Sequence, residues 1–285
     1  MQRVAYQTVI DQAAALAGFT TSTLTTSPKG ILRTFINRRL KSAWDKYWWP
    51  ELMRAELRYY RAAYDAGTAY TAGNQVYYST TGLYYQATDS TTGNAPTDTN
   101  YWSQLTDLDP YIALEQTGQT AIGTVRSVYK DDPEAVHRPR RVLFRMAPAG
   151  IQVLGEDVPS SVYVWFRTRC PVLLGTDFSA STAYTAGQTV YYTSSTYDYD
   201  GDWWVCQSTT SAGETPESTP AKWTRQEFPA WLRDCVAQAA YADWLRQDGT
   251  PEAARLEEAT AMQFLFEAYH NAGPAQRQIS HAAGA

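Results

Sequence analysis

The sequence predicts an α+β fold: helices at both ends of the chain, a central β-rich region and two small inserted all-β modules. Three observations predict it. Apolar residues follow helical spacing near both ends, one aromatic-rich segment occurs twice in the interior, and short β-like runs lie between its copies. Of the 285 residues, 44% are hydrophobic, so the chain can bury a core. The net charge of −5 disfavours a general nucleic-acid coat. No apolar run is long enough to predict a membrane-spanning helix.

The first segment, residues 1–63, is predicted to hold the N-terminal helices. One helix is expected over 3–18 and a second over 28–48, where Pro28 occupies the first helical position. Pro50 ends the second helix, because the residue before a proline avoids the helical region. Apolar residues recur every fourth position along one face of this helix, at Leu32, Ile36, Leu40 and Trp44.

A basic segment accompanies the second helix. Residues 29–61 contain nine Lys and Arg against three Asp and Glu, a net charge of about +6, so the rest of the chain sums to about −11. The segment can be a solvated surface, a subunit-facing surface or a DNA-groove reader, and we favour the first two. We expect its cations to meet acidic partners on another subunit: Arg33, Arg38, Arg39 and Lys41.

Two segments of the chain repeat each other. Thr68–Tyr78 and Thr182–Tyr192 agree at nine of eleven positions, and each copy closes with a tryptophan further on. The copies predict two small β-modules, at 64–105 and 179–226, each made of a glycine turn, a hairpin and a closing strand. The second copy carries a longer hairpin, over 194–202.

The shared pattern is Ala-Tyr-x-x-Gly-x-x-Val, then a Tyr-Gln-Ala strand in the first copy, Gly-x-x-Pro and a closing Trp. It resembles the small chitin- and cellulose-type carbohydrate-binding modules found beside chitinases. The resemblance implies aromatic rings just after the Tyr-Gln-Ala strand, but these positions hold Asp89, Ser90, Thr209 and Thr210. A reused structural module is therefore favoured over sugar binding. If glycan stacking survives, the expected rings are Tyr85, Trp102, Trp203, Trp204 and Trp223.

The remaining segments complete the organisation. Residues 106–178 contain short β-like runs separated by turn residues and form the central β-rich region. Residues 227–271 are predicted to hold two C-terminal helices, the second beginning at Pro251. Residues 272–285 are small and polar without periodicity, which indicates an extended or disordered tail.

No sequence motif indicates an enzyme. GxSxG, GxxxxGK and GxGxxG patterns are absent, so we expect no catalytic residue and no cofactor. Two carboxylates of a glycoside hydrolase cannot be paired from one sequence, and Asp131-Asp132 is interpreted as a turn. Cys170, Cys206 and Cys235 form no CxxC pair, so we expect free thiols and no metal site.

The order of motifs around the modules resembles the neck proteins of tailed bacteriophages, the head–tail adaptors (connectors) beneath the portal. A Trp-x3-Trp-Trp-Pro-Glu-Leu segment follows the basic helix, and the motifs run in the order Trp44–Leu52, Leu114–Gly118, Ile122–Gly123, Tyr129–Pro133 and Val162–Arg167. The resemblance implies a helical-bundle adaptor core and a homo-oligomeric ring, with twelve copies expected, through which DNA passes without specific binding.

The same resemblance implies the partners and the location. The partners would be the portal protein and tail or neck proteins, with no membrane, and the four basic residues would face the portal or a neighbouring subunit. The protein would be made in the host cytoplasm and located in the virion neck, between capsid and tail. The alternative is a carbohydrate-binding surface or fibre protein of a phage that contacts host glycans.

Overall fold

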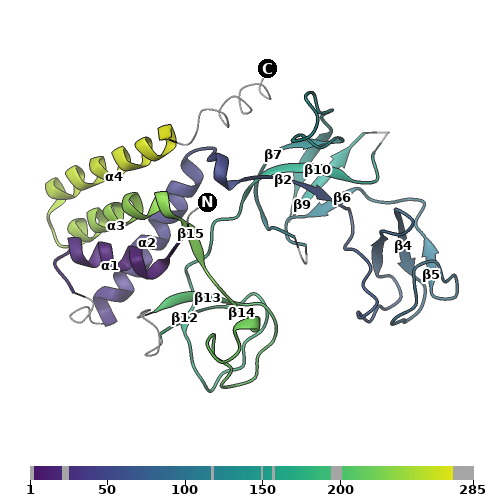
Figure 1. Cartoon of the computed structure of the whole chain (residues 1–285), viewed down its shortest axis with the longest axis horizontal. Coiled ribbons are helices and arrows are strands. Elements are labelled where there is room, and N and C mark those ends of the chain that lie inside the picture. Colours follow the sequence, from purple (N-terminus) through teal and green to yellow (C-terminus); the bar gives the residue numbers. More distant parts are fainter. Residues whose placement is uncertain are drawn as a thin grey trace. The chain divides into compact units, whose positions relative to one another are not determined.

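The computed structural model describes residues 3–20, 26–116, 119–148, 150–155, 158–193 and 201–271. The chain divides into two units (Figure 1). The first unit combines residues 1–51 with 170–285, and the second comprises residues 52–169. The module at 64–105 therefore belongs to the second unit, and the module at 179–226 belongs to the first unit. The expected tail 272–285 and most of the longer hairpin, 194–200, lie outside the described residues.

The predicted α+β fold with a helical-bundle adaptor core is wrong. Within the described ranges, strands form five separate sheets and outnumber the four α-helices. The N-terminal segment is not helical throughout, because the chain after Lys46 enters a 3₁₀ turn, η1 (Pro50–Leu52), and then strand β2 (Met53–Arg58). The first residues of the expected helix 3–18 instead form strand β1 (Arg3–Ala5), which pairs with β15 (Glu227–Pro229).

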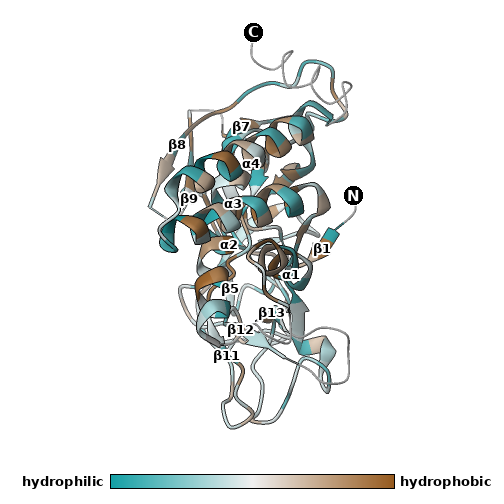
Figure 2. Ribbon diagram, turned by 90° about the vertical axis from the view of Figure 1, so that its left-hand side faces the viewer, coloured by the Kyte–Doolittle hydropathy of each residue, from teal (hydrophilic) through white to brown (hydrophobic). Residues whose placement is uncertain are grey.

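Four helices belong to the first unit: α1 (Tyr6–Leu16), α2 (Thr26–Lys46), α3 (Arg233–Gln247) and α4 (Pro251–Asn271). Helix α3 contacts the other three, and a further 3₁₀ turn, η3 (Ala230–Leu232), precedes it. Helix α4 begins at the predicted Pro251, where the missing N–H costs nothing. Hydrophobic and hydrophilic residues alternate along α3 and α4 (Figure 2). In the described chain, none of the helices combines the length and hydropathy needed to cross a membrane.

The second unit is built on two antiparallel sheets. One has the order β2–β10–β7, with β7 (Ile122–Tyr129) and β10 (Val162–Thr168). The other has the order β6–β9–β8, with β6 (Tyr111–Ala113), β8 (Leu143–Ala147) and β9 (Gly150–Leu154). The buried side chains of both sheets share one hydrophobic cluster, which includes Ile112, Ile122, Ile151, Val164 and Phe166.

The two sequence copies form the same three-stranded antiparallel sheet. In the first module the strands are β3 (Gln75–Tyr78), β4 (Leu83–Ala87) and β5 (Trp102–Gln104). In the second they are β12 (Thr189–Tyr192), β13 (Asp202–Cys206) and β14 (Trp223–Arg225), preceded by a 3₁₀ turn, η2 (Pro220–Lys222). The second sheet gains a parallel strand, β11 (Thr176–Asp177).

Equivalent hydrogen bonds and ring contacts hold both modules together. The N–H of Gly73 donates to the carbonyl of Ala87 at 2.8 Å, and the N–H of Gly187 donates to the carbonyl of Cys206 at 2.8 Å. Both glycines have positive φ, 93° and 88°, which glycine adopts without strain. In the first core Trp102 meets a tyrosine ring at 5.2 Å, and in the second Trp223 meets one at 5.5 Å. Both closing tryptophans are buried in these cores.

Candidate functional site

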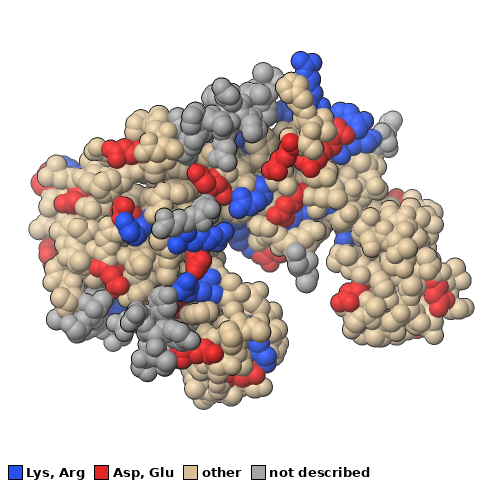
Figure 3. Space-filling view, viewed as in Figure 1, with Lys and Arg blue, Asp and Glu red and all other residues tan. Residues whose placement is uncertain are grey.

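The cations predicted to face another subunit have acidic partners inside their own unit. Arg33 donates to Asp177 at 2.9 Å, and Lys41 pairs with Asp45 one helical turn further along α2. Arg38 and Arg39 both bind Asp243 on α3. The structure therefore brings Arg38 and Arg39 together and leaves the other two at separate places along α2. Lys and Arg lie beside Asp and Glu on the face shown in Figure 3.

Asp243 is the centre of an ion-pair network that joins three helices. Its carboxylate accepts hydrogen bonds from Arg39 Nε at 2.7 Å and from Arg39 Nη2 at 2.5 Å. Arg246 donates at 2.9 Å, and Arg39 also reaches Glu258 on α4 at 3.0 Å. Burial by itself raises the pKa of Asp243, but the hydrogen bonds from Arg39 and Arg38 outweigh it and hold the pKa below its ordinary value. This network fixes helices α2, α3 and α4 to one another.

The four predicted cations differ in how much of each side chain reaches solvent. The side chains of Arg33 and Arg39 are each 20% exposed, whereas Arg38 is 61% exposed and Lys41 is 64% exposed. The guanidinium carbon of Arg33 lies 3.4 Å from the ring centroid of Tyr191, so this cation packs on a ring of its own unit. Arg38 and Lys41 are the two that present charge at the surface.

The rings predicted to stack on glycans are mostly inside the modules. Tyr85, Trp102, Trp203 and Trp223 are buried, and Trp204 is half-buried against the second module's core. A sugar stacks on an exposed ring face, and these four rings do not present one. Tyr85 and Trp102 belong to the second unit, whereas Trp203, Trp204 and Trp223 belong to the first.

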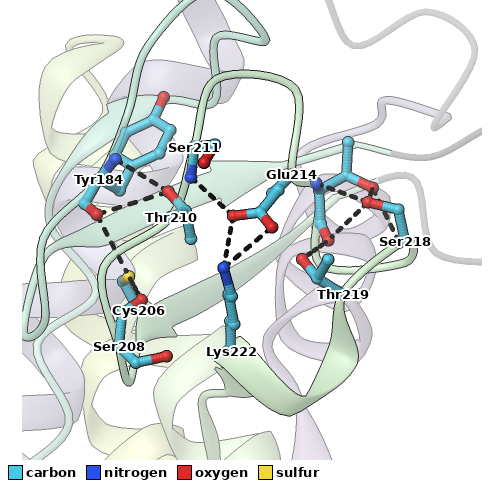
Figure 4. A network of polar contacts seen from close by, with 10 residues as sticks. Tyr184, Cys206, Ser208, Thr210, Ser211, Glu214, Ser218, Thr219 and Lys222 are labelled. Carbon is cyan, nitrogen blue, oxygen red and sulfur yellow. Dashed lines mark hydrogen bonds and ion pairs between the residues drawn. The ribbon is translucent and has the colours of Figure 1, made fainter.

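The loop at the expected sugar-platform position of the second module is held by internal polar contacts (Figure 4). Thr210 is buried and its hydroxyl accepts the N–H of Tyr184 at 2.9 Å. Glu214 accepts the N–H of Ser211 at 2.6 Å and pairs with Lys222 Nζ at 2.7 Å. The loop's polar groups are thus engaged with one another.

Sequence reasoning missed a second face on each module, which docks the module onto its own unit. In the first module, Tyr77 stacks on Tyr59 at 3.9 Å and the hydroxyl of Tyr84 donates to the carbonyl of Ser160 at 2.7 Å. Tyr77 and Tyr84 are opposite each other in the β3–β4 register. Because neighbouring side chains on a strand point to opposite faces, a Tyr-Tyr pair supplies one ring to the core and one to this docking face.

The second module docks through the equivalent register pair, Tyr191 and Trp203. Tyr6 of α1 meets Tyr191 at 6.1 Å and Trp203 at 6.2 Å between ring centroids, both edge-on. Arg33 of α2 covers the Tyr191 ring. The sequence signal for this face was available in the Tyr191-Tyr192 and Trp203-Trp204 doublets.

A buried carboxylate, Asp202, lies at the same docking face. Its Oδ1 accepts the backbone N–H groups of Tyr6 and Trp203, each at 3.2 Å, while its Oδ2 has no hydrogen-bond partner among the described residues. Burial raises the pKa of Asp202 to about 7, although the nearby charge of Arg225 acts in the opposite direction. The carboxyl group can therefore titrate near neutral pH in the contact between module and helices.

A small pocket opens beside this contact. Its volume is about 160 Å³, below the roughly 300 Å³ at which ligand pockets usually begin. Its lining residues are Arg33, Asp177, Phe178, Tyr191, Tyr192 and Thr193. The two charged residues that line the pocket, Arg33 and Asp177, already form an ion pair with each other, so neither charge is left to bind a ligand.

Helix α4 carries large apolar side chains on its exposed surface. Leu256 is 72% exposed and Phe266 is 54% exposed, with Met262 also exposed between them. These residues and Ala259 lie within about a third of the helix circumference, at a turn of about 100° per residue. We call Leu256, Ala259, Met262 and Phe266 the α4 stripe. Large exposed apolar patches on folded proteins mark surfaces that contact a protein, a membrane or a ligand.

Comparison with models of known protein families and with curated proteins finds no match to this chain. Across the described residues, no group of three His, Cys, Asp or Glu side chains could hold a metal ion. All three cysteines are buried and no disulfide joins them.

Proposed function

We propose that this protein is a structural virion protein, a head-to-tail adaptor of a tailed bacteriophage. It forms a homo-oligomeric ring below the portal, connects the capsid to the tail and lets DNA pass. Its partners are the portal protein and the tail or neck proteins, and its place is the virion neck. The order of sequence motifs supports this proposal, and the observation that carries it is the α4 stripe, because an adaptor subunit needs apolar surface for its neighbours.

The charge distribution supports passage of DNA without specific binding. A DNA-binding surface needs cations that are available to phosphates, but Arg33 and Arg39 are mostly covered and paired with carboxylates. The first module, residues 64–105, contains three Asp and neither Lys nor Arg, and its surface in Figure 3 shows acidic patches. A channel wall of this composition would not retain DNA.

Co-sedimentation with purified portal rings of the same phage tests the proposal. The full chain should migrate with the portal ring at physiological salt, in several copies per ring, and should not migrate with portal rings of an unrelated phage. A deletion of the gene should yield heads and tails that remain separate. Normal virions from the deletion, or a chain that ignores its own portal, would contradict the adaptor function.

A further inference from the structure

The α4 stripe and the basic surface of α2 are two unlike faces of one unit. Helix α4 carries four Glu and one Arg, a net charge of −3. Helix α2 carries six Lys and Arg and one Asp, a net charge of +5. Arg33 and Arg39 are mostly covered and paired within their own unit, so the outward cations of this helix include Arg38, Lys41 and Lys46. Surfaces of opposite charge attract and set the register of a contact, whereas like surfaces repel.

Both faces also contain apolar side chains. On α2, Phe35 is half-buried beside Arg38, and Trp48, just beyond the helix, is exposed. On α4, the stripe is flanked by the exposed carboxylates Glu252 and Glu267. An apolar centre with a charged rim is the usual anatomy of a protein interface.

The segment that follows α4 does not suit the stripe. Residues 272–285 contain one large apolar side chain, Ile279, among small and polar residues. One such side chain cannot cover Leu256, Met262 and Phe266 together. A second copy of the chain, which offers the basic and aromatic α2 face, matches the stripe in both charge and apolarity.

We infer that α4 of one copy packs on the α2 face of the next copy, with the α4 stripe at the centre of a head-to-tail contact. This inference deepens the proposed function, because it rests on ring assembly and names the surfaces that join the subunits. A contact between two different faces repeats from copy to copy and forms a ring when the rotation between copies closes, whereas a contact between identical faces stops at a dimer. Arg38 and Lys41 face the neighbour, while Arg33 and Arg39 hold their own unit together.

Sedimentation velocity and native mass spectrometry of the full chain test this contact. Met262→Ser with Phe266→Ser should raise the concentration needed for assembly about tenfold or more, because apolar interface anchors carry most of the binding energy. The matched control is Leu143→Ser with Met146→Ser, which removes two exposed apolar residues of β8 in the other unit. Far-UV circular dichroism should show that both variants keep their helices.

A charge exchange identifies the partner face. Lys41→Glu with Lys46→Glu should weaken assembly several-fold, and so should Glu252→Lys with Glu267→Lys, since many copies add small ion-pair contributions. All four changes in one chain should restore assembly, because the opposite charges meet again.

Four results would overturn the proposed contact. The chain with all four charge changes could stay dissociated, or the β8 control could weaken assembly as much as the α4 variant does. The wild-type chain could stay monomeric, or it could form a dimer that depends on the stripe but not on the charges. None of these results decides the proposed function, because binding of the chain to portal rings is measured separately. An intact ring in the α4 variant would thus refute this interface and leave the adaptor role standing.

Discussion

Replacing Asp202 by Asn should remove a pH dependence from the stability of the first unit. The folded state raises the pKa of Asp202 from 3.8 to about 7, and the main cause is its burial. As the pH rises above 4, the carboxyl group ionises in the unfolded chain while it stays neutral in the folded one. The folded state is therefore favoured most below about pH 4, and this contribution is lost as the pH rises to about 7.

The size of the effect follows from the two pKa values. At about 1.4 kcal/mol for each pH unit, the loss amounts to roughly 4 kcal/mol between pH 4 and pH 7. The side-chain oxygen of Asn can still accept the backbone N–H groups of Tyr6 and Trp203, which Asp202 binds in the wild type. We therefore expect Asp202→Asn to be about 2–4 kcal/mol more stable than the wild type at pH 8 and within about 1 kcal/mol of it at pH 4.5.

Urea unfolding followed by tryptophan fluorescence, from pH 4.5 to 8, measures this difference. Subtracting the two curves removes the groups that titrate in both proteins. Glu252→Gln, at a carboxylate that is 82% exposed, serves as the control for a carboxyl-to-amide change at the surface. A flat difference between Asp202→Asn and the wild type, or a variant less stable than the wild type at pH 8, would refute the reasoning.

Three further expectations follow from the packing. Arg39→Ala leaves the buried Asp243 carboxylate without its bidentate partner and should cost about 2–4 kcal/mol, whereas the exposed Arg38→Ala should cost about 0–1 kcal/mol. Equal costs in urea unfolding would contradict the central place of Arg39. Trp102→Ala and Trp223→Ala should each cost about 3–5 kcal/mol and change the near-ultraviolet circular dichroism, and a loss below about 1 kcal/mol would mean that neither ring supports its core. The full chain should pass through chitin and cellulose columns without retention, since the candidate rings are buried, and retention would contradict this.

Features with a local cause could be predicted from the sequence. Gly18 ends the first helix because it adopts a φ of 79°, which other residues avoid. Pro251 begins α4 because its ring fixes the helical φ and its missing N–H has no partner there anyway. The repeated modules were visible because their glycine turns and core rings stand at fixed spacings.

Features that depend on distant partners could not be predicted. Arg3–Ala5 become a strand only because Glu227–Pro229 lies beside them. The carboxylate that Arg39 binds is 204 positions away in the sequence. The strand at the start of the chain was missed for this reason, since local periodicity marks helices but says nothing of short strands that pair over long distances. The wrong helical-bundle core came from the family resemblance and not from periodicity.

The candidate sugar-binding rings failed for a related reason. Trp203 and Trp204 are neighbours in the sequence but point to opposite faces of their strand. Local pattern cannot tell which face meets solvent and which meets the rest of the unit. In the structure one ring packs at the docking face and the other on the module's own core.

The docking faces give the two modules separate identities. Their interiors share equivalent glycine-turn hydrogen bonds and tryptophan–tyrosine contacts. Their outer faces differ, because one offers Tyr77 and Tyr84 to a tyrosine and a carbonyl, and the other offers Tyr191 and Trp203 to an arginine and a tyrosine. The two copies of the duplicated segment thus share one core, while two side chains on the docking face of each copy determine which part of the chain that copy packs against.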